Sequence, residues 1–240
     1  MRIMVLQARR GDDPMLGHER DCFVAATGLD RDSFDWRNVV DSVPMLSDVL
    51  AADALLIGGS GHFSVARPDV AFFGPLSELL RDVCSSRHPT FGSCFGYQLL
   101  VAALGGTVAP DPAGGEVGSF EVSLTDDGRI DPIFGALPPV FTAQMGHLDS
   151  AAELPAGVVN LAVSERCPYQ ALRVDGAPIW ATQFHPELDQ AANLHRYLAY
   201  IERYRPEGDD VDDGFASEPS PETSTLLPRF LDGVATGAFR

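Results

Sequence analysis

The N-terminal part of the chain alternates between short apolar runs and longer segments in which apolar side chains recur with helical spacing. Parallel strands need crossover connections, which are usually helices, so this alternation predicts a parallel sheet covered on both faces. We therefore expect an α/β fold with a mostly parallel open sheet flanked by helices. The expected strands are residues 3–7, 34–40, 54–57 and 89–92, and the expected helices are residues 14–27, 45–50, 70–83 (interrupted at Gly74-Pro75) and 97–104.

Between residues 107 and 184 the pattern changes to consecutive strand-like runs. Turn-forming sequences separate several of these runs, for example Asp126-Asp127-Gly128. Consecutive strands joined by tight turns form antiparallel hairpins, so we expect a smaller antiparallel β region attached to the parallel sheet. The runs are residues 119–124, 140–145, 158–163, 169–174 and 179–184, and helical spacing returns over residues 188–204.

The C-terminal segment differs in composition from the rest of the chain. Residues 205–223 are rich in Asp, Glu, Gly, Ser and Pro, which predicts an exposed linker, much of it mobile. Beyond it, residues 226–234 have an apolar face at helical spacing. We expect this helix to pack on the chain's own core, with docking on a partner or a second copy as the alternative. The predicted organisation is a domain over residues 1–204, followed by an acidic linker and helix over residues 205–240.

The charge balance excludes some classes of partner. The chain carries 34 acidic and 17 basic residues, a net charge of −17, and its pI is about 4.5. Because like charges repel, we expect no nucleic acid and no anionic membrane surface as partner. No apolar run approaches the length of a membrane span, and the N-terminus is more typical of a first strand than of a signal peptide.

The four cysteines, Cys22, Cys84, Cys94 and Cys167, have no CxxC spacing. This scatter predicts free thiols in a reducing, cytoplasmic compartment rather than a disulfide framework. The sequence has no HExxH motif and no cluster of Cys and His, so we expect no metal and no cofactor.

The segment from Gly92 to Gly96, Gly-Ser-Cys-Phe-Gly, lies between an expected strand and an expected helix. A nucleophile on a sharp strand-to-helix turn needs small residues two positions to either side, because the backbone there is strained and crowded. The helix N-terminus favours the thiolate, and its free N–H groups can bind a developing oxyanion. This context predicts that Cys94 is a nucleophile. The alternative is a small buried apolar side chain, which is the common role of cysteine.

The segment Phe184-His185-Pro186-Glu187 follows the last expected strand. Side chains at positions i and i+2 of an extended segment point the same way, and Pro186 favours an extended His185. Glu187 can therefore orient the imidazole of His185, which can accept the thiol proton and protonate a leaving amine. Taken alone, this segment is more typical of a surface histidine at a helix start, where Glu187 favours the helix N-terminus.

Together, the two segments resemble the signature motifs of the class I glutamine amidotransferases. Two further stretches strengthen the likeness: Gly58-Gly59-Ser60-Gly61, which is similar to the family's oxyanion-strand glycines, and residues 145–149 (Met-Gly-His-Leu-Asp), which are similar to a strand of the glutaminase domain of GMP synthase. The resemblance covers residues 1–204 and is strongest to stand-alone, GMP-synthase-like members. It implies a flavodoxin-like fold with Cys94 as nucleophile, His185 as general base and acid, and Glu187 as the acid that orients it.

The resemblance also implies substrate-binding roles. The N–H groups of Gly59 and Phe95 would form an oxyanion hole, and Gln98 would help to hold glutamine. The backbone near Gly146 and His147 would bind the α-amino and α-carboxylate groups. The chain departs from the family in two places, with Ser60 where proline is frequent and Tyr97 where histidine is common, which affects the expected shape of the pocket more than its chemistry.

Three functions fit these motifs. The first is a glutaminase that cleaves the side-chain amide of glutamine through a cysteine thioester and releases ammonia, with an ammonia-accepting synthase as a candidate partner. The second is a γ-glutamyl peptidase or hydrolase that uses the same triad on a larger leaving group. The third is a non-catalytic regulatory module, which would not require Cys94, His185 and Glu187 together.

Overall fold

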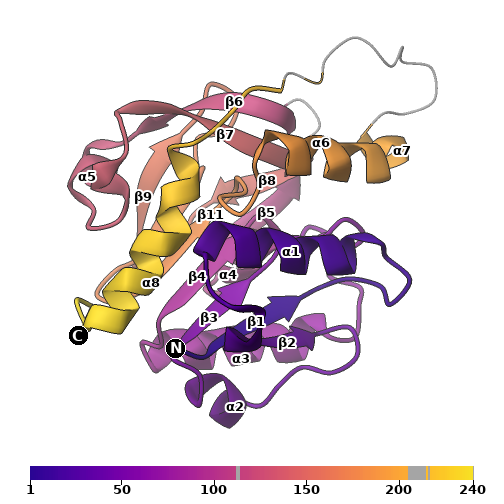
Figure 1. The fold of residues 1–240 in the computed structure, drawn as a ribbon, viewed down its shortest axis with the longest axis vertical. Coiled ribbons are helices and arrows are strands. Elements are labelled where there is room, and N and C mark those ends of the chain that lie inside the picture. Colours follow the sequence, from indigo (N-terminus) through magenta and orange to yellow (C-terminus); the bar gives the residue numbers. More distant parts are fainter. Residues whose placement is uncertain (112–113, 205–214, 216, 240) are drawn as a thin grey trace.

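A nine-stranded mixed sheet forms the centre of the computed structural model, which describes residues 1–111, 114–204, 215 and 217–239 (Figure 1). Its strand order is β2-β1-β3-β4-β11-β10-β9-β6-β7, and a separate two-stranded sheet pairs β5 with β8. The strands are β1 Ile3–Gln7, β2 Phe34–Asn38, β3 Ala54–Ile57, β4 Thr90–Ser93, β5 Thr107–Pro110, β6 Glu116–Leu124, β7 Val140–His147, β8 Asp149–Glu153, β9 Val158–Val163, β10 Ala171–Val174 and β11 Ile179–Thr182.

The five strands from β2 to β11 in this order pair in parallel, and those from β11 to β7 pair in antiparallel fashion. This arrangement confirms the predicted fold class, an α/β fold with a mostly parallel sheet and an attached antiparallel region. The helices are α1 Met15–Thr27, α2 Leu46–Leu50, α3 Phe73–Ser85, α4 Phe95–Ala103, α5 Asp126–Ile130, α6 Gln190–Ala199, α7 Ile201–Tyr204 and α8 Leu226–Thr236.

Helices cover the parallel strands on both faces, which explains why these strands are apolar throughout. Successive side chains of a strand point to opposite faces. In β1, Ile3 and Val5 join one core cluster, which includes residues of α1 and α8, whereas Met4 and Leu6 join the other, beneath α3 and α4. The parallel strands thereby end at one shared edge, and the two expected catalytic segments both follow strands at this edge.

The structure corrects the sequence prediction in two respects. Strands β5 and β8 were not expected, and Gly74 and Pro75 do not interrupt a helix, because they lie in the first turn of α3. Proline is tolerated there, since the N–H groups of the first turn have no intrahelical partner. Helix α1 ends as predicted, with Gly28 in the left-handed conformation at φ 68°.

Helix α8 packs on the chain's own core, as expected. Its side chains Leu226, Leu227, Phe230 and Leu231 are buried in the cluster that also contains residues of the central strands. Within residues 217–223 of the predicted linker, Glu218, Pro219 and Pro221 are exposed, whereas Ser220 and Thr223 are buried. There, Gln144 donates to the carbonyl of Glu218 and to the hydroxyl of Ser220, which, like Thr223, is buried. The rest of the predicted linker, residues 205–214 and 216, lies outside the described residues.

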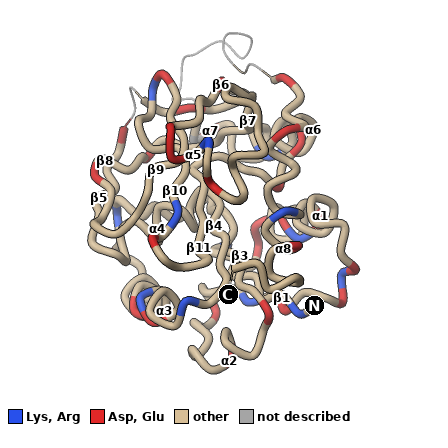
Figure 2. The backbone as a smooth tube through the Cα atoms, turned by 90° about the vertical axis from the view of Figure 1, so that its left-hand side faces the viewer, with Lys and Arg blue, Asp and Glu red and all other residues tan. Residues whose placement is uncertain are grey.

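Acidic residues are distributed over helices and loops in the view of Figure 2, which fits the strongly negative net charge. Within the described part of the chain, no helix is both long enough and apolar enough to span a bilayer.

Candidate active site

Cys94 lies at the turn between β4 and α4, in a backbone conformation that few residues with side chains adopt. Its φ and ψ are 51° and −99°. A Cβ atom on Gly92 would lie 2.9 Å from the carbonyl carbon of Gly96, and one on Gly96 would lie 2.6 Å from the carbonyl oxygen of Ile57. Both contacts are too close for a side chain, so the two glycines are required by the tight passage of the backbone, as the sequence predicted.

His185 and Glu187 follow β11 and lie next to Cys94. Nδ1 of His185 is 2.7 Å from Oε1 of Glu187, and both side chains are almost completely buried. Oε2 of Glu187 accepts a hydrogen bond of 2.7 Å from the hydroxyl of Ser93, the residue before Cys94. The N–H of His185 donates to the carbonyl of Gln144 in β7 (2.9 Å). The imidazole is therefore fixed by both its ring and its backbone.

The electrostatics of the pair follow from burial and from neighbouring charges. Burial disfavours the imidazolium, but the charges of Glu187 and Cys94, and hydrogen bonds to both, outweigh it and raise the pKa of His185 to about 9. Burial also disfavours the ionised carboxylate, but His185, Arg196 and the Ser93 hydroxyl lower the pKa of Glu187 to about 2. At neutral pH, these values favour an imidazolium paired with a carboxylate.

Gln183 is a site residue that the sequence motifs did not reveal. Its side-chain amide donates to Sγ of Cys94 at 3.8 Å, and its Oε1 accepts from Nε2 of Gln98 at 3.1 Å. The same Gln98 nitrogen also donates to the carbonyl of Asp149 (2.7 Å). Gln183 directly precedes the segment that begins at Phe184, and this closeness was the sequence signal available for it.

The backbone N–H groups of the two predicted oxyanion donors, Phe95 and Gly59, differ in their hydrogen bonding. Phe95 is the first residue of α4, and the N–H groups of a first helical turn have no intrahelical acceptor. The N–H of Gly59 instead donates to Oε1 of buried Glu19 (3.1 Å), whose carboxylate also forms a salt bridge with Arg9 (2.8 Å). An oxyanion can use the Gly59 donor only when this hydrogen bond is broken.

A small cavity at Cys94 brings most of the predicted substrate residues together. It measures about 20 Å³, and its lining includes Phe95, Gln98, Gly146 and His147. This volume holds about one water molecule, so glutamine requires the cavity to widen.

Two residues that line this cavity have their side chains fixed by hydrogen bonds. The hydroxyl of Tyr204 donates to the carbonyl of Gly146 (3.2 Å), and the imidazole of His147 contacts the carboxylate of Glu116 (3.0 Å). An outer cavity of about 760 Å³ adjoins the inner one and shares Phe63, Leu148, Asp149 and Tyr204 with it.

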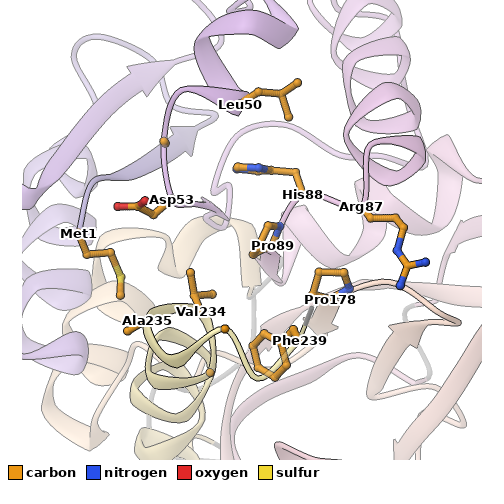
Figure 3. Close-up of a pocket in the computed structure, with 13 residues that line it drawn as sticks. Met1, Leu50, Asp53, Arg87, His88, Pro89, Pro178, Val234, Ala235 and Phe239 are labelled. Carbon is orange, nitrogen blue, oxygen red and sulfur yellow. The ribbon is translucent and has the colours of Figure 1, made fainter.

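A larger cavity, of about 860 Å³, lies at the opposite end of the parallel strands (Figure 3). Met1, Asp53, His88 and Phe239 are among its lining residues, and none of the predicted site residues is. The chemistry of the side chains, rather than the size of the cavity, therefore locates the candidate active site at Cys94. No group of three or more His, Cys, Asp or Glu side chains among the described residues is arranged to hold a metal ion.

Similarity to known proteins extends over most of the chain. The family model described as glutamine amidotransferase class-I matches residues 38–201. One subunit of the glutamine-hydrolyzing GMP synthase of Methanosarcina acetivorans is 30% identical over 186 residues, which are 75% of this chain and 89% of that protein. The corresponding subunit from Thermococcus kodakarensis is 33% identical over 137 residues, 56% of this chain and 71% of that protein.

Solved structures agree on the fold. The glutamine amidotransferase of Methylobacillus flagellatus matches with a TM-score of 0.72 at 22% identity, covering 98% of this chain and 92% of that one. A glutamine amidotransferase of Thermotoga maritima matches with a TM-score of 0.69 at 18% identity, with coverage of 98% and 92%. With the family model matching more than half of its length, the chain belongs to the class I glutamine amidotransferase family.

Selective alkylation tests whether the thiol of Cys94 is more reactive than the thiols of the other three cysteines. Burial raises the pKa of Cys22 to about 12 and the pKa values of Cys84 and Cys167 to about 11, so these thiols stay protonated at neutral pH. Cys94 lies beside the imidazole of His185 and at a helix N-terminus, which is the environment typical of reactive cysteines. We expect iodoacetamide at pH 7 to modify Cys94 at least about tenfold faster than the other three, as measured by peptide mass spectrometry. Equal labelling of all four would contradict this assignment.

Proposed function

We propose that the chain hydrolyses the side-chain amide of glutamine, with Cys94 as nucleophile and with His185 and Glu187 completing the triad. The observation that carries this proposal is the placement of a cysteine at a strained strand-to-helix turn beside a buried imidazole–carboxylate pair with an N–O distance of 2.7 Å. A buried carboxylate that orients an imidazole next to a nucleophile is the arrangement that acyl transfer requires.

The proposed reaction proceeds through two acyl-transfer steps. The thiolate of Cys94 attacks the amide carbon of glutamine, and the N–H of Phe95 stabilises the resulting oxyanion. His185 protonates the leaving nitrogen, so ammonia departs and a γ-glutamyl thioester remains. His185 then accepts a proton from the water molecule that attacks the thioester, and cleavage of the C–S bond releases glutamate and restores the Cys94 thiolate beside the imidazolium. Glu187 holds the imidazole in place and stays ionised throughout.

The fate of the ammonia is the second part of the proposal. The two relatives described above are named as subunits of a glutamine-hydrolyzing GMP synthase. By analogy with them, we propose that a separate synthase accepts the ammonia from this chain. The candidate contact surface is the outer cavity, because it adjoins the nucleophile's cavity.

A second candidate function is γ-glutamyl peptide hydrolysis by the same triad. It is favoured by the size of the outer cavity, about 760 Å³, which provides room for a leaving group larger than ammonia. The two candidates share every chemical step and differ only in the amine that leaves.

Product analysis on purified protein separates these candidates. We expect glutamate and ammonia to be released from glutamine in equal amounts, and faster than glutamate is released from γ-glutamyl dipeptides at the same concentration. Coupled glutamate dehydrogenase assays measure both products. Turnover of the dipeptides without turnover of glutamine would establish the second candidate. Turnover of neither substrate, by the chain alone or with a synthase added, would leave the non-catalytic module as the function.

A further inference from the structure

Arg196 is a buried arginine that none of the sequence motifs includes. It lies on α6, and its side chain is 6% exposed. Its Nη1 is 3.3 Å from Oε1 of Glu187 and 3.2 Å from Nδ1 of His185. Nδ1 already contacts the carboxylate, so the second distance is a close approach of two nitrogens rather than a hydrogen bond. The positive charge of Arg196 thus lies directly beside the imidazole.

The buried guanidinium of Arg196 is only partly compensated by hydrogen bonds among the described residues. Nε and Nη2 of Arg196 are buried and have no hydrogen-bond partner among the described residues. Buried donors without acceptors are rare and call for an explanation. If Arg196 only anchored α6, more of its donors would be expected to be paired, as those of Arg9 are with Glu19 and Tyr200.

The charges at the site explain why a cation is useful there. An isolated buried carboxylate next to His185 would bind the imidazolium so strongly that the proton would be difficult to release. Release is necessary, because the proposed reaction requires His185 to donate its proton to the leaving nitrogen, which departs as ammonia. The permanent positive charge of Arg196 pairs with the same carboxylate oxygen. Glu187 therefore has a cationic partner whether or not His185 is protonated.

We propose that Arg196 is a positioning residue of the triad, whose charge keeps Glu187 ionised and leaves the imidazole of His185 able to release its proton. This inference rests on the proposed catalytic role of His185. It assigns Arg196 an electrostatic role, which differs from a packing role in a measurable way.

Other titratable groups near the guanidinium define its surroundings. Helix α1 contributes His18 and Cys22, whose Sγ lies 3.6 Å from the His18 ring. Helix α6 contributes His195, whose ring centroid lies 4.8 Å from that of His18. The charge of Arg196 lowers the pKa of His18, after burial, which has the larger effect. His18 is therefore neutral at the alkaline pH where His185 titrates and does not mask the effect of Arg196 on it.

The test is the titration of His185 in Arg196→Met, monitored by the NMR signals of its ring protons. A His185→Gln variant assigns these signals. Removing a positive charge beside an imidazole favours the imidazolium, so the titration midpoint should move up by about one pH unit. Arg196→Lys keeps the charge and should leave the midpoint near the wild-type value. Arg229→Met, on the exposed side of α8, is the matched control and should cause no shift. An unchanged midpoint in folded Arg196→Met would overturn the proposal.

A second comparison covers the case in which Arg196→Met does not fold. Glu187→Gln and the double variant Glu187→Gln/Arg196→Met differ only in the arginine, and the double variant leaves neither buried charge unpaired. The His185 midpoint should be higher in the double variant by about one pH unit, and equal midpoints would again overturn the proposal.

These titrations need no substrate, so they remain informative if glutamine proves not to be turned over. Where activity is present, the alkaline limb of the profile of kcat/KM against pH should move upward with the NMR midpoint. A purely structural role for Arg196 would lower the rate without moving that limb.

Discussion

Cys94→Ala should reduce glutamine hydrolysis by about 10⁴-fold or more, because removing the nucleophile of an acyl-transfer enzyme eliminates the covalent route. The side chain is small and lies in a turn whose shape is set by Gly92 and Gly96, so the fold should be retained. Initial rates of ammonia release, together with circular dichroism spectra of the same samples, measure the two quantities. The expected result is wild-type structure with background activity.

Matched controls make this result specific to Cys94. Cys22→Ala and Cys167→Ala also remove a buried thiol, but neither thiol contacts Nδ1 or Nε2 of His185 in the described structure. Both variants should keep at least about half of the wild-type rate, since they act only through packing. Near-normal turnover by a folded Cys94→Ala protein would refute the proposed mechanism.

Phe230→Ala should reduce the free energy of unfolding by about 3–5 kcal/mol, the usual cost of truncating a fully buried phenylalanine. Phe230 is completely buried, and its ring centroid lies 5.7 Å from that of Phe91 and 6.1 Å from that of Trp180. These partners belong to β4 and β11, the strands that lead to Cys94 and His185. Urea denaturation monitored by fluorescence measures the change.

The control for this prediction is Arg229→Ala, one residue earlier in α8 and exposed to solvent. It should change stability by less than about 0.5 kcal/mol. A similarly small effect of Phe230→Ala would show that α8 does not contribute to this core. In that case, loss of an oligomer or a partner complex on deletion of residues 217–240 would support the alternative that the helix docks elsewhere.

The parallel half of the fold was predictable because its signals are local. The strands at Ile3–Gln7 and Ala54–Ile57 are continuous apolar runs, and the helix that ends at Thr27 is followed by Gly28 in the conformation that glycine favours. The antiparallel strands were also largely recognised. Their order in the sheet was not, since the placement of β9 between β10 and β6 depends on long-range pairing that no local pattern encodes.

The missed strands β5 and β8 illustrate the same limit. Thr107–Pro110 and Asp149–Glu153 pair with one another across a long stretch of chain, and their exposed or mixed composition gives no clear period. Likewise, the division of the chain at residue 204 stays a prediction, although α8 packs on the core formed by the preceding strands.

The site was predictable to the extent that its residues lie in the two motifs. Cys94, His185 and Glu187 were named from the two motifs and from the family that these motifs resemble, and the structure brings the three side chains together. Arg196 could not have been found this way, because its approach to Glu187 depends on how α6 turns back over the sheet. The hydrogen bond between Gly59 and Glu19 was also outside the reach of the sequence, since it joins two segments 40 residues apart.

Trapping the covalent intermediate is the most direct test of the central claim that Cys94 forms a γ-glutamyl thioester. The wild-type protein is mixed with glutamine, quenched in acid within milliseconds to seconds, digested, and mapped by mass spectrometry. We predict a glutamyl adduct on the peptide that contains Cys94, absent from Cys94→Ala and accumulating in Glu187→Gln if hydrolysis of the thioester slows more than its formation. Glutamine turnover without any adduct on Cys94, or with an adduct on another residue, would contradict the account.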